Sequence, residues 1–475
     1  MKKGKIVSSL TFKFMERLLV KGLGLIISVI LARLLSPTEF GEIAIIMVFI
    51  NLCLTFVQSG LNTALIQSKE TKKEDYSTVF YISLSVAVLL VVILCIVAPW
   101  VGKYYDNERL ILPLQVYSLS LVFAAFNSVQ VAKMIKEMAF KEMFVCTLLA
   151  CILSGIFGVS LAFYGAGIWA LVGYYFSNTV ISCVTMIFAA KWLPGLVFSI
   201  RRAKELFSYG WKMLVSAFLC SLYADIRTLI VGKMFSSADL GYYNRGQQFP
   251  DILSNTLDNS MQSVMFPVIA EAQDNSEKVK DMLKKTVAFG TALIMPVMIG
   301  LAAVSESFIE VLLTEKWLPC VEYMQILCLG YAVLSIESSN LVAIKAIGRS
   351  DVYMKLEAVR RVVMLLILLV SVFCFRTVYA IALGFAISTW VDVLIISIPT
   401  KRLLNYGIVE QIKDTWKIMI ASLIMGGVVI LVGFLSLPTI VLLGVQIIVG
   451  IITYVFLTIL LNRELIKEVL SFIKK

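Results

Sequence analysis

The sequence predicts an all-α protein that crosses a membrane about 14 times. Apolar residues make up 60% of its 475 residues and charged residues only 15%. Soluble chains have roughly 45–50% apolar residues and about 25% charged residues. Stretches of about 20 mostly apolar residues, the length that spans a hydrocarbon core of roughly 30 Å, recur along the chain. A motif that occurs twice, 200 residues apart, further predicts that the helices form two pseudo-symmetric bundles.

The apolar stretches define the predicted spanning helices in order. Their centres lie near Leu25, Phe49, Leu89, Leu121, Leu153, Val180, Phe218, Asp258, Leu293, Leu334, Leu368, Ala386, Ile424 and Ile451. The first is expected to remain as a spanning helix, because charged residues interrupt it and no small-residue cleavage site ends it.

Basic residues predict how these helices are oriented. Loops rich in Lys and Arg alternate with loops that hold one or two of them, and cytoplasmic loops carry such an excess. The basic segments include residues 133–141, 191–204, 278–285, 345–361 and 401–417. Both termini are therefore expected to be cytoplasmic.

The repeated motif reads LARLLSPTEFGEIA at residues 31–44 and VGKMFSSADLGYYN at residues 231–244. A second pair, NSVQVAKMI at 127–135 and SNLVAIKAI at 339–347, follows the same order. The two copies lie six helices apart and so face the same way, as in parallel transporter repeats. We predict an N-terminal six-helix bundle over 1–199, a parallel C-terminal bundle over 200–405, and helices 13 and 14 with a cytoplasmic tail over 406–475.

Two predicted spanning helices carry polar residues in register. Helix 8 presents a face at spacings of three or four, formed by Gln248, Asp251, Asn255, Asp258 and Gln262. Helix 2 presents Asn51, Thr55, Gln58 and Asn62, each 200 residues before one of the last four. Unsatisfied polar groups in hydrocarbon are costly, so both faces are expected to line a hydrated central cavity. The alternative is a pair of hydrogen-bonded interhelical zippers without a cavity.

Charged residues within the predicted spans are candidate substrate or ion contacts. Arg17 and Lys21 lie four residues apart on helix 1, and Arg227 lies near the outer end of helix 7. Arginine suits phosphate oxygens, and the amides of the polar faces suit hydroxyl groups, so a phosphorylated sugar is a fitting substrate. Arg227 alternatively pairs with a neighbouring helix.

Three acids inside the predicted spans remain: Asp225, Glu337 and Asp392. Each is a candidate ion-coupling site. Glu337 and Asp392 are alternatively structural partners of Lys21 or Arg227.

Several function classes are excluded by the residues that the chain contains. It has no histidine, so histidine bases and HExxH zinc sites are absent. There is no GxxxxGK[ST] motif for nucleotide hydrolysis, and no predicted outside loop exceeds roughly a dozen residues. The nine cysteines fit buried apolar positions. We therefore predict no catalytic residues, no metal, no cofactor and no enzyme activity. The net charge of +11 reflects membrane topology and not nucleic-acid binding.

The segments ILARLLSPTEFGEIA, SGLNTALIQSKE and LGYYNRGQQFPDILSNTLDNSMQSVMFPVIAEAQ resemble the polysaccharide-export flippases of the Wzx and teichuronic-acid exporter type. These belong to the multidrug/oligosaccharidyl-lipid/polysaccharide superfamily. The resemblance extends from about residue 10 to about residue 400. Helices 13 and 14 resemble a pair found in only some members.

The resemblance implies a flippase of the bacterial inner membrane. Such a protein moves an undecaprenyl-pyrophosphate-linked oligosaccharide repeat, of O-antigen, capsule, exopolysaccharide or teichuronic type, from the inner to the outer leaflet by alternating access. Polymerase or export machinery is an implied partner. Members often carry basic residues in helices 1 and 7, which Arg17, Lys21 and Arg227 match loosely by position.

Three other functions compete with this one. A cation-coupled multidrug antiporter of the same fold would favour an acidic, aromatic-lined cavity. A lipid II flippase belongs to the same superfamily. A membrane polymerase or ligase would need a sizeable catalytic loop outside the membrane, which the predicted topology lacks.

Overall fold

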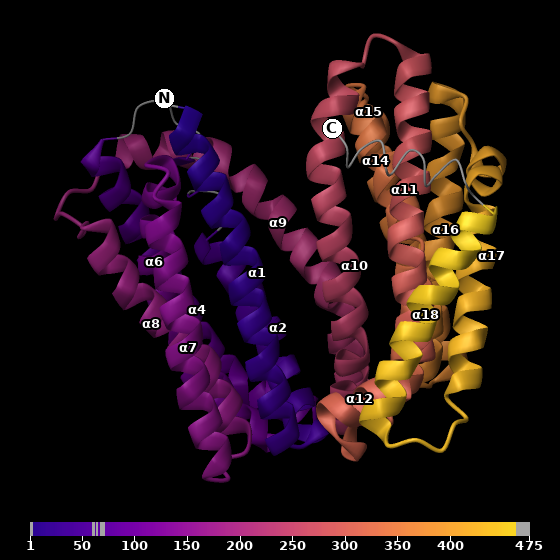
Figure 1. Ribbon diagram of the computed structural model, residues 1–475. Helices are drawn as coiled ribbons and strands as arrows, with labels where there is room; N and C mark the ends of the chain where they lie inside the picture. The colour runs from indigo at the N-terminus through magenta and orange to yellow at the C-terminus, as the bar shows by residue number, and fades with distance from the viewer. Residues whose placement is uncertain (1–2, 59–61, 63–64, 67–71, 462–475) are drawn as a thin grey trace. The chain divides into compact units, whose positions relative to one another are not determined.

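The computed structural model describes residues 3–58, 62, 65–66 and 72–461, and side chains from residue 19 onward except at 73, 209 and 212. Within these ranges the regular structure is helical, with no β-strand (Figure 1). The all-α class predicted from the sequence is confirmed. The chain divides into two compact units, with the boundary between Gly241 and Tyr242.

The first unit holds the helices up to α9 and the start of α10. They are α1 (Lys3–Leu34), α2 (Pro37–Gln58), α4 (Lys73–Tyr104), α5 (Ile111–Ser118), α6 (Ser120–Lys136), α7 (Phe140–Phe163), α8 (Ile168–Ala190) and α9 (Ile200–Met234). Within this unit α7 packs against α8 and α1, and α2 packs against α9.

The second unit holds most of α10 and all later helices. They are α10 (Ser237–Glu271), α11 (Ser276–Ala303), α12 (Ser305–Leu313), α13 (Cys320–Tyr331), α14 (Leu334–Ala346), α15 (Ser350–Val370), α16 (Val378–Leu404), α17 (Ile408–Val432) and α18 (Thr439–Leu461). Here α14 packs against α11, α15 and α16, and α17 packs against α11 and α18.

Twelve helices within the described residues are long and apolar enough to cross a membrane. The polytopic class is therefore confirmed. Every predicted centre lies inside a helix, but those near Leu25 and Asp258 fall in α1 and α10, which are outside the twelve. The count of 14 and the cytoplasmic position of the termini stay predictions.

Two of the predicted spans are each built from two helix segments. The span centred near Leu121 consists of α5 and α6, and the span centred near Leu334 consists of α13 and α14. A short 3₁₀ turn precedes each pair, at Glu108–Leu110 and at Glu315–Trp317. The same sequence of turn, short helix and second helix thus occurs in both halves of the chain.

The repeated motif forms the same helix start twice. The Ser36 backbone N–H donates to the Glu39 carboxylate at 2.6 Å, and the Glu39 N–H donates to Ser36 Oγ at 3.4 Å. At α10 the Ser236 N–H donates to Asp239 at 3.2 Å and the Asp239 N–H donates back at 3.1 Å. This reciprocal capping satisfies backbone donors that the first helical turn leaves unpaired.

The segment 191–199 joins α8 to α9 and is fixed onto the start of α4. The backbone N–H of Gly195 donates to Ser77 Oγ at 3.0 Å, and that of Ser199 donates to Thr78 Oγ1 at 3.1 Å. A loop held by side chains in this way has its backbone donors satisfied without regular structure.

An ion pair completes the attachment of this segment. Arg202, in the first turn of α9, donates from Nε and Nη2 to the buried carboxylate of Asp75 at 2.7 and 2.8 Å. Its Nη1 donates to Glu205 at 2.8 Å. These carboxylates raise the pKa of Arg202, and the two-point contact fixes the orientation of the guanidinium plane.

Candidate functional site

The polar face of α10 is a connected set of side chains in the second unit. The Asn255 amide donates to Asp251 Oδ1 at 2.8 Å, and the Gln262 amide donates to Asp258 Oδ1 at 3.2 Å. Each pair is separated by one helical turn, which places its members on one side of the helix. Gln248 continues this side toward the start of α10 and accepts a hydrogen bond from Arg245.

Neutral donors from α13 and α14 hold the two carboxylates of this face. The Tyr331 hydroxyl donates to Asp251 Oδ1 at 2.8 Å, and the Ser338 hydroxyl donates to Asp258 Oδ1 at 2.5 Å. Gln262 also donates to Ser338 Oγ at 2.9 Å, while its carbonyl oxygen is buried without a partner. Neither carboxylate pairs with a cation among the described residues.

An ion cluster lies on another side of α14. Arg360 of α15 donates through Nη2 to Glu337 of α14 and, at 3.2 Å, to Asp392 of α16. Its Nη1 donates to Glu357 at 2.7 Å, and Arg361 pairs with Glu357 at 3.1 Å. The structure therefore brings the predicted candidates Glu337 and Asp392 together and supplies Arg360 as their shared partner.

Burial makes the charge balance of this cluster important. The side chains of Arg360, Glu337 and Asp392 are only 11–12% exposed, and buried charges cost several kcal/mol each unless paired. Three carboxylates contact the Arg360 guanidinium, and one of them, Glu357, also contacts Arg361. Asp392 Oδ1 and Arg360 Nε are buried without a partner. With all three carboxylates ionised, the cluster has three negative charges against the two positive charges of Arg360 and Arg361.

The sequence pattern marks Arg360 only as part of a cytoplasmic segment and assigns no role to Tyr331 or Ser338. One signal points to Arg360: two unmatched acids inside predicted spans require a cation. The polar run SIESSN at 335–340 was the corresponding signal for Ser338.

Helix α14 contacts the polar face of α10, the ion cluster and a third neighbour, α17. Ser338 and Ser339 contact Gln262 of α10, while Glu337 contacts Arg360. Asn340 exchanges amide hydrogen bonds with Gln411 of α17 at 3.2 and 3.1 Å, both groups being buried. Four consecutive residues of one helix thus bind three different neighbours.

The remaining predicted site residues lie in the first unit. On α2 the Thr55 hydroxyl donates to the Asn51 carbonyl at 3.0 Å. Gln58 is exposed at the end of α2, and its carbonyl accepts from the buried Asn62 at 2.9 Å. Asn62 Oδ1 is buried without a partner. These contacts are local, so the predicted cavity shared with α10 stays a prediction.

The predicted basic contacts also lie in the first unit. Lys21 is exposed on α1, and Asp225 and Arg227 are half-buried on α9. The side chain of Arg17 lies outside the described residues. The roles assigned to these residues from the sequence stay predictions.

A family model described as "Polysaccharide biosynthesis protein" matches residues 30–322. The succinoglycan biosynthesis transport protein ExoT of Rhizobium meliloti is 23% identical over 331 residues, 70% of this chain and 67% of that protein. The lipopolysaccharide biosynthesis protein WzxC of Escherichia coli is 23% identical over 363 residues, 74% of this chain and 72% of that protein.

A solved structure of similar fold is the lipid II flippase MurJ in an inward closed conformation. It matches with a TM-score of 0.78 at 18% identity, covering 96% of this chain and 100% of that chain. This likeness shows the fold. The relatives and the twelve apolar helices identify a multi-pass protein of the bacterial inner membrane. The resemblance seen in the sequence motifs is confirmed.

Proposed function

We propose that this chain, which belongs to the polysaccharide biosynthesis protein family, moves a lipid-linked oligosaccharide from the inner to the outer leaflet. The substrate class is an undecaprenyl-pyrophosphate-linked repeat unit. The observation that carries the proposal is the polar face of α10, where two carboxylates are held by neutral hydroxyl and amide groups. A sugar hydroxyl both donates and accepts hydrogen bonds. It can therefore take the place of a protein hydroxyl or amide that contacts one of these carboxylates.

The proposed path has two chemical parts. The polar face of α10, with Asp251, Asn255 and Asp258, receives sugar hydroxyls that would otherwise lose their hydrogen bonds in hydrocarbon. Arg17, Lys21 and Arg227 receive the pyrophosphate, because guanidinium and ammonium groups bind phosphate oxygens. The apolar polyprenyl chain needs no polar path and stays in the lipid.

The ion cluster is the proposed energy input. Glu337 and Asp392 face one Arg360, so a proton or a monovalent cation would neutralise the surplus negative charge. Ser338, the next residue along α14, donates to Asp258. A change in the charge state of the cluster that shifts α14 would therefore act directly on the α10 face.

A cation-coupled multidrug antiporter is the main rival. A carboxylate that binds cationic drugs must be available to them, and Asp251 and Asp258 already accept from Tyr331 and Ser338. The neutral partners favour sugar. A lipid II substrate shares the same chemistry and is distinguished by experiment only.

The test uses a strain that lacks the gene but still makes its lipid-linked repeat units. An impermeant enzyme or label applied to intact spheroplasts reports how much of this material reaches the outer leaflet. Restoring the gene should convert protected material into accessible material. Material that is already accessible without the gene would refute flipping.

Variants sharpen this test. Asp258→Asn together with Ser338→Ala should slow the appearance of accessible material. The matched control Ser263→Ala removes an exposed α10 hydroxyl whose only hydrogen bond within the described part of the chain is to the Ser260 carbonyl, and it should leave the rate unchanged. Lipid II labelled in the same spheroplasts tests the alternative substrate. Under our proposal, the distribution of lipid II between the two leaflets should not depend on this gene.

A further inference from the structure

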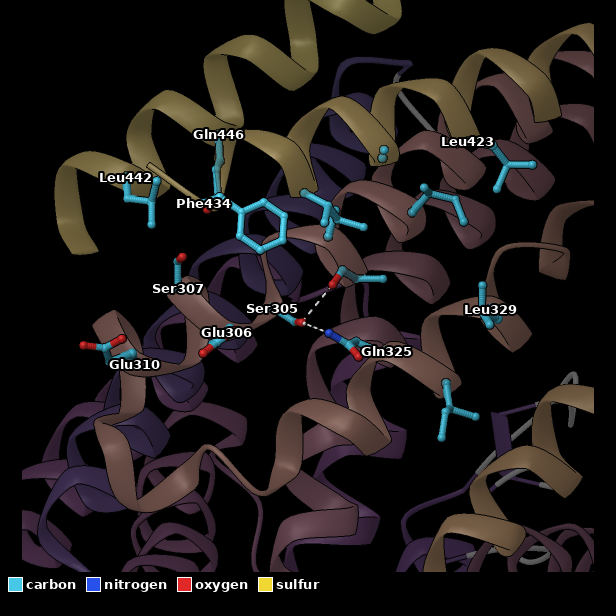
Figure 2. A pocket seen from close by; sticks show the side chains of 18 of the residues that line it. Ser305, Glu306, Ser307, Glu310, Gln325, Leu329, Leu423, Phe434, Leu442 and Gln446 are labelled. Carbon is cyan, nitrogen blue, oxygen red and sulfur yellow. Dashed lines mark hydrogen bonds between the residues drawn. The ribbon is translucent and has the colours of Figure 1, made fainter. Parts of the chain in front are cut away.

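Two cavities lie at different levels along α17 in the second unit. The smaller, of about 190 Å³, is lined by the first half of α17, from Ile408 to Met419, together with α16 and the start of α14. The larger, of about 680 Å³, is lined by α17 residues from Leu423 onward and by α11, α12, α13 and α18 (Figure 2). We call the smaller cavity the α16/α17 groove.

The wall of the α16/α17 groove is apolar. Trp390 Nε1 donates to the Leu329 carbonyl at 3.1 Å, and the Thr415 hydroxyl donates to the Gln411 carbonyl at 2.8 Å. The Gln411 amide pairs with Asn340. The polar groups beside the groove are thus bonded within the protein, and the wall presents hydrocarbon to a ligand. Its apolar side chains include Val333, Ile336, Val393, Leu394, Ile408 and Ile412.

The groove has the length of one lipid chain in one leaflet. Ile408 and Met419 are 11 residues apart on α17, or roughly 16 Å along the helix axis. One leaflet supplies about half of a hydrocarbon core of roughly 30 Å. The side chains of Trp390, Leu394 and Ile412 are 41–51% exposed, so a chain from the surrounding lipid can enter from the side.

Beyond Met419 the wall along α17 becomes partly polar. Ser305, Glu306 and Gln325 line the larger cavity, and Figure 2 shows Gln325 donating to Ser305, at 2.9 Å. A hydrocarbon chain that extended past the groove would cover these polar groups, which costs free energy. The groove therefore favours an acyl chain of one leaflet over a long polyprenyl chain.

Basic side chains lie beyond the other end of the groove, in the last turn of α16. Lys401 follows Trp390 and Leu394 at spacings of 11 and seven residues, which places it on the side of α16 that lines the groove. Lys401 and its neighbour Arg402 are both exposed. They lie past the apolar wall, where a lipid whose chain fills the groove carries its headgroup.

The start of α17 adds to this positive charge. Lys413 is exposed in the second turn of the helix. Glu410 lies in the first turn, and its carboxylate accepts from the backbone N–H of Gly407 at 2.9 Å. Lys401, Arg402 and Lys413 carry three positive charges against this one negative charge. An anionic headgroup is the complementary partner.

We infer that the α16/α17 groove binds an anionic phospholipid, with one acyl chain in the groove and the phosphate at Lys401 and Arg402. Burial of the chain and attraction of the phosphate both favour binding. The chain packs against Ile336 of α14 and so supports the position of that helix. The inference does not rest on the proposed function, because none of the lining residues belongs to the α10 face or to the ion cluster.

Native mass spectrometry of the purified, delipidated protein tests the inference by counting the lipid molecules it retains. Dioleoylphosphatidylglycerol should bind at the first site roughly tenfold or more tightly than dioleoylphosphatidylcholine, which has the same chains and no net charge. The double variant Lys401→Gln/Arg402→Gln should lose this preference. Ile412→Trp, which fills part of the groove, should weaken the first binding step for both lipids.

Two matched controls accompany these variants. Lys141→Gln/Lys278→Gln also removes two exposed positive charges, from residues that do not line the groove, and should keep the preference. Ile420→Trp adds the same bulk at a 40% exposed position of α17 outside the groove and should leave the first binding step unchanged. Each variant should elute from gel filtration as the wild type does.

Equal affinities of the wild type for the two phospholipids would overturn the inference. So would an unchanged preference in Lys401→Gln/Arg402→Gln, or unchanged binding in Ile412→Trp. Undecaprenyl phosphate is titrated in the same way: tighter binding than phosphatidylglycerol, lost in Ile412→Trp, would assign the groove to a polyprenyl chain instead. The spheroplast assay measures flipping separately, so failure of this inference and failure of the proposed function are distinguishable.

Discussion

Gly41 and Gly241 make reciprocal contacts at the starts of α2 and α10. A Cβ on Gly41 would lie 1.7 Å from the Ser237 carbonyl oxygen, and a Cβ on Gly241 would lie 2.0 Å from the Pro37 carbonyl oxygen. Position 41 faces 237 and position 241 faces 37, so the two copies of the motif meet in a self-complementary way, as in an isologous contact. Glycine is required at both positions because only a hydrogen fits against the opposing backbone.

Gly41→Ala or Gly241→Ala should therefore lower the thermal stability of the purified protein. The opposing atoms are backbone atoms and cannot rotate away, so the cost should reach or exceed the roughly 1–3 kcal/mol of an overpacked core. Gly444→Ala, in α18, meets no atom within 4 Å and should be neutral or stabilising. Equal unfolding temperatures for the three variants would contradict the close contact.

Removing the cation of the buried cluster should destabilise the protein strongly. Arg360→Met leaves Glu337 and Asp392 facing each other without a partner, a change that typically costs about 3–5 kcal/mol. Adding Glu337→Gln and Asp392→Asn to Arg360→Met should recover much of the loss, which denaturant unfolding can measure. Arg349→Gln breaks an exposed ion pair with Asp351 and should have no measurable effect. Failure of the triple variant to recover would argue against charge as the cause.

The hydrogen bond between Ser338 and Asp258 should matter for transport. Ser338→Ala leaves a buried carboxylate with one partner fewer, at a cost of about 1–3 kcal/mol. If that bond helps to orient the polar face, the rate in the spheroplast assay should fall by roughly tenfold. Ser338→Thr keeps the hydroxyl and should retain most of the rate. Equal rates for both variants would show that the hydroxyl is not used.

The ion pairs of Glu205 with Arg201 and Arg202 at the start of α9 should weaken in acid. Hydrogen bonds from Arg202 and then Arg201 hold the pKa of Glu205 below its ordinary value. A lowered folded-state pKa stabilises the fold above the unfolded value of about 4.3, and this contribution is lost as the pH falls through the folded-state value. The difference in unfolding temperature between wild type and Glu205→Gln should therefore be present at pH 7 and vanish on acidification below about pH 4.

The exposed acid Glu137 serves as the control for this pH profile. Its carboxylate lies 3.6 Å from Lys133 and is 54% exposed, so Glu137→Gln should give a small difference at every pH. A difference for Glu205→Gln that does not change between pH 7 and 3 would contradict the ion pair.

Periodicity predicted the helices and their faces but not their neighbours. Every predicted centre lies in a helix, and Asp251, Asn255, Asp258 and Gln262 share a face as their spacing requires. The donors that hold this face come from residues about 80 positions away. Nothing local in the sequence assigns Ser338 to Asp258, because that pairing depends on which helices pack together.

Other features lacked a local signal for a different reason. The break between α5 and α6 occurs at Leu119, without a glycine or proline to mark it. The sequence pattern assigns Arg360 to topology, because a basic residue near a helix end fits the positive-inside pattern. Its burial follows from contacts with two other helices, which a single-sequence pattern does not contain.

The contacts of α14 restrict how this segment can change over evolutionary time. Consecutive helical residues are about 100° apart around the axis, so inserting or deleting one residue between Glu337 and Asn340 would turn one part of the helix away from its neighbours. The ion cluster, the α10 face and the amide pair with Gln411 cannot then all persist. Substitutions can accumulate along the apolar side of α14, whereas the length of SIESSN is fixed, and homologous chains should align across it without gaps.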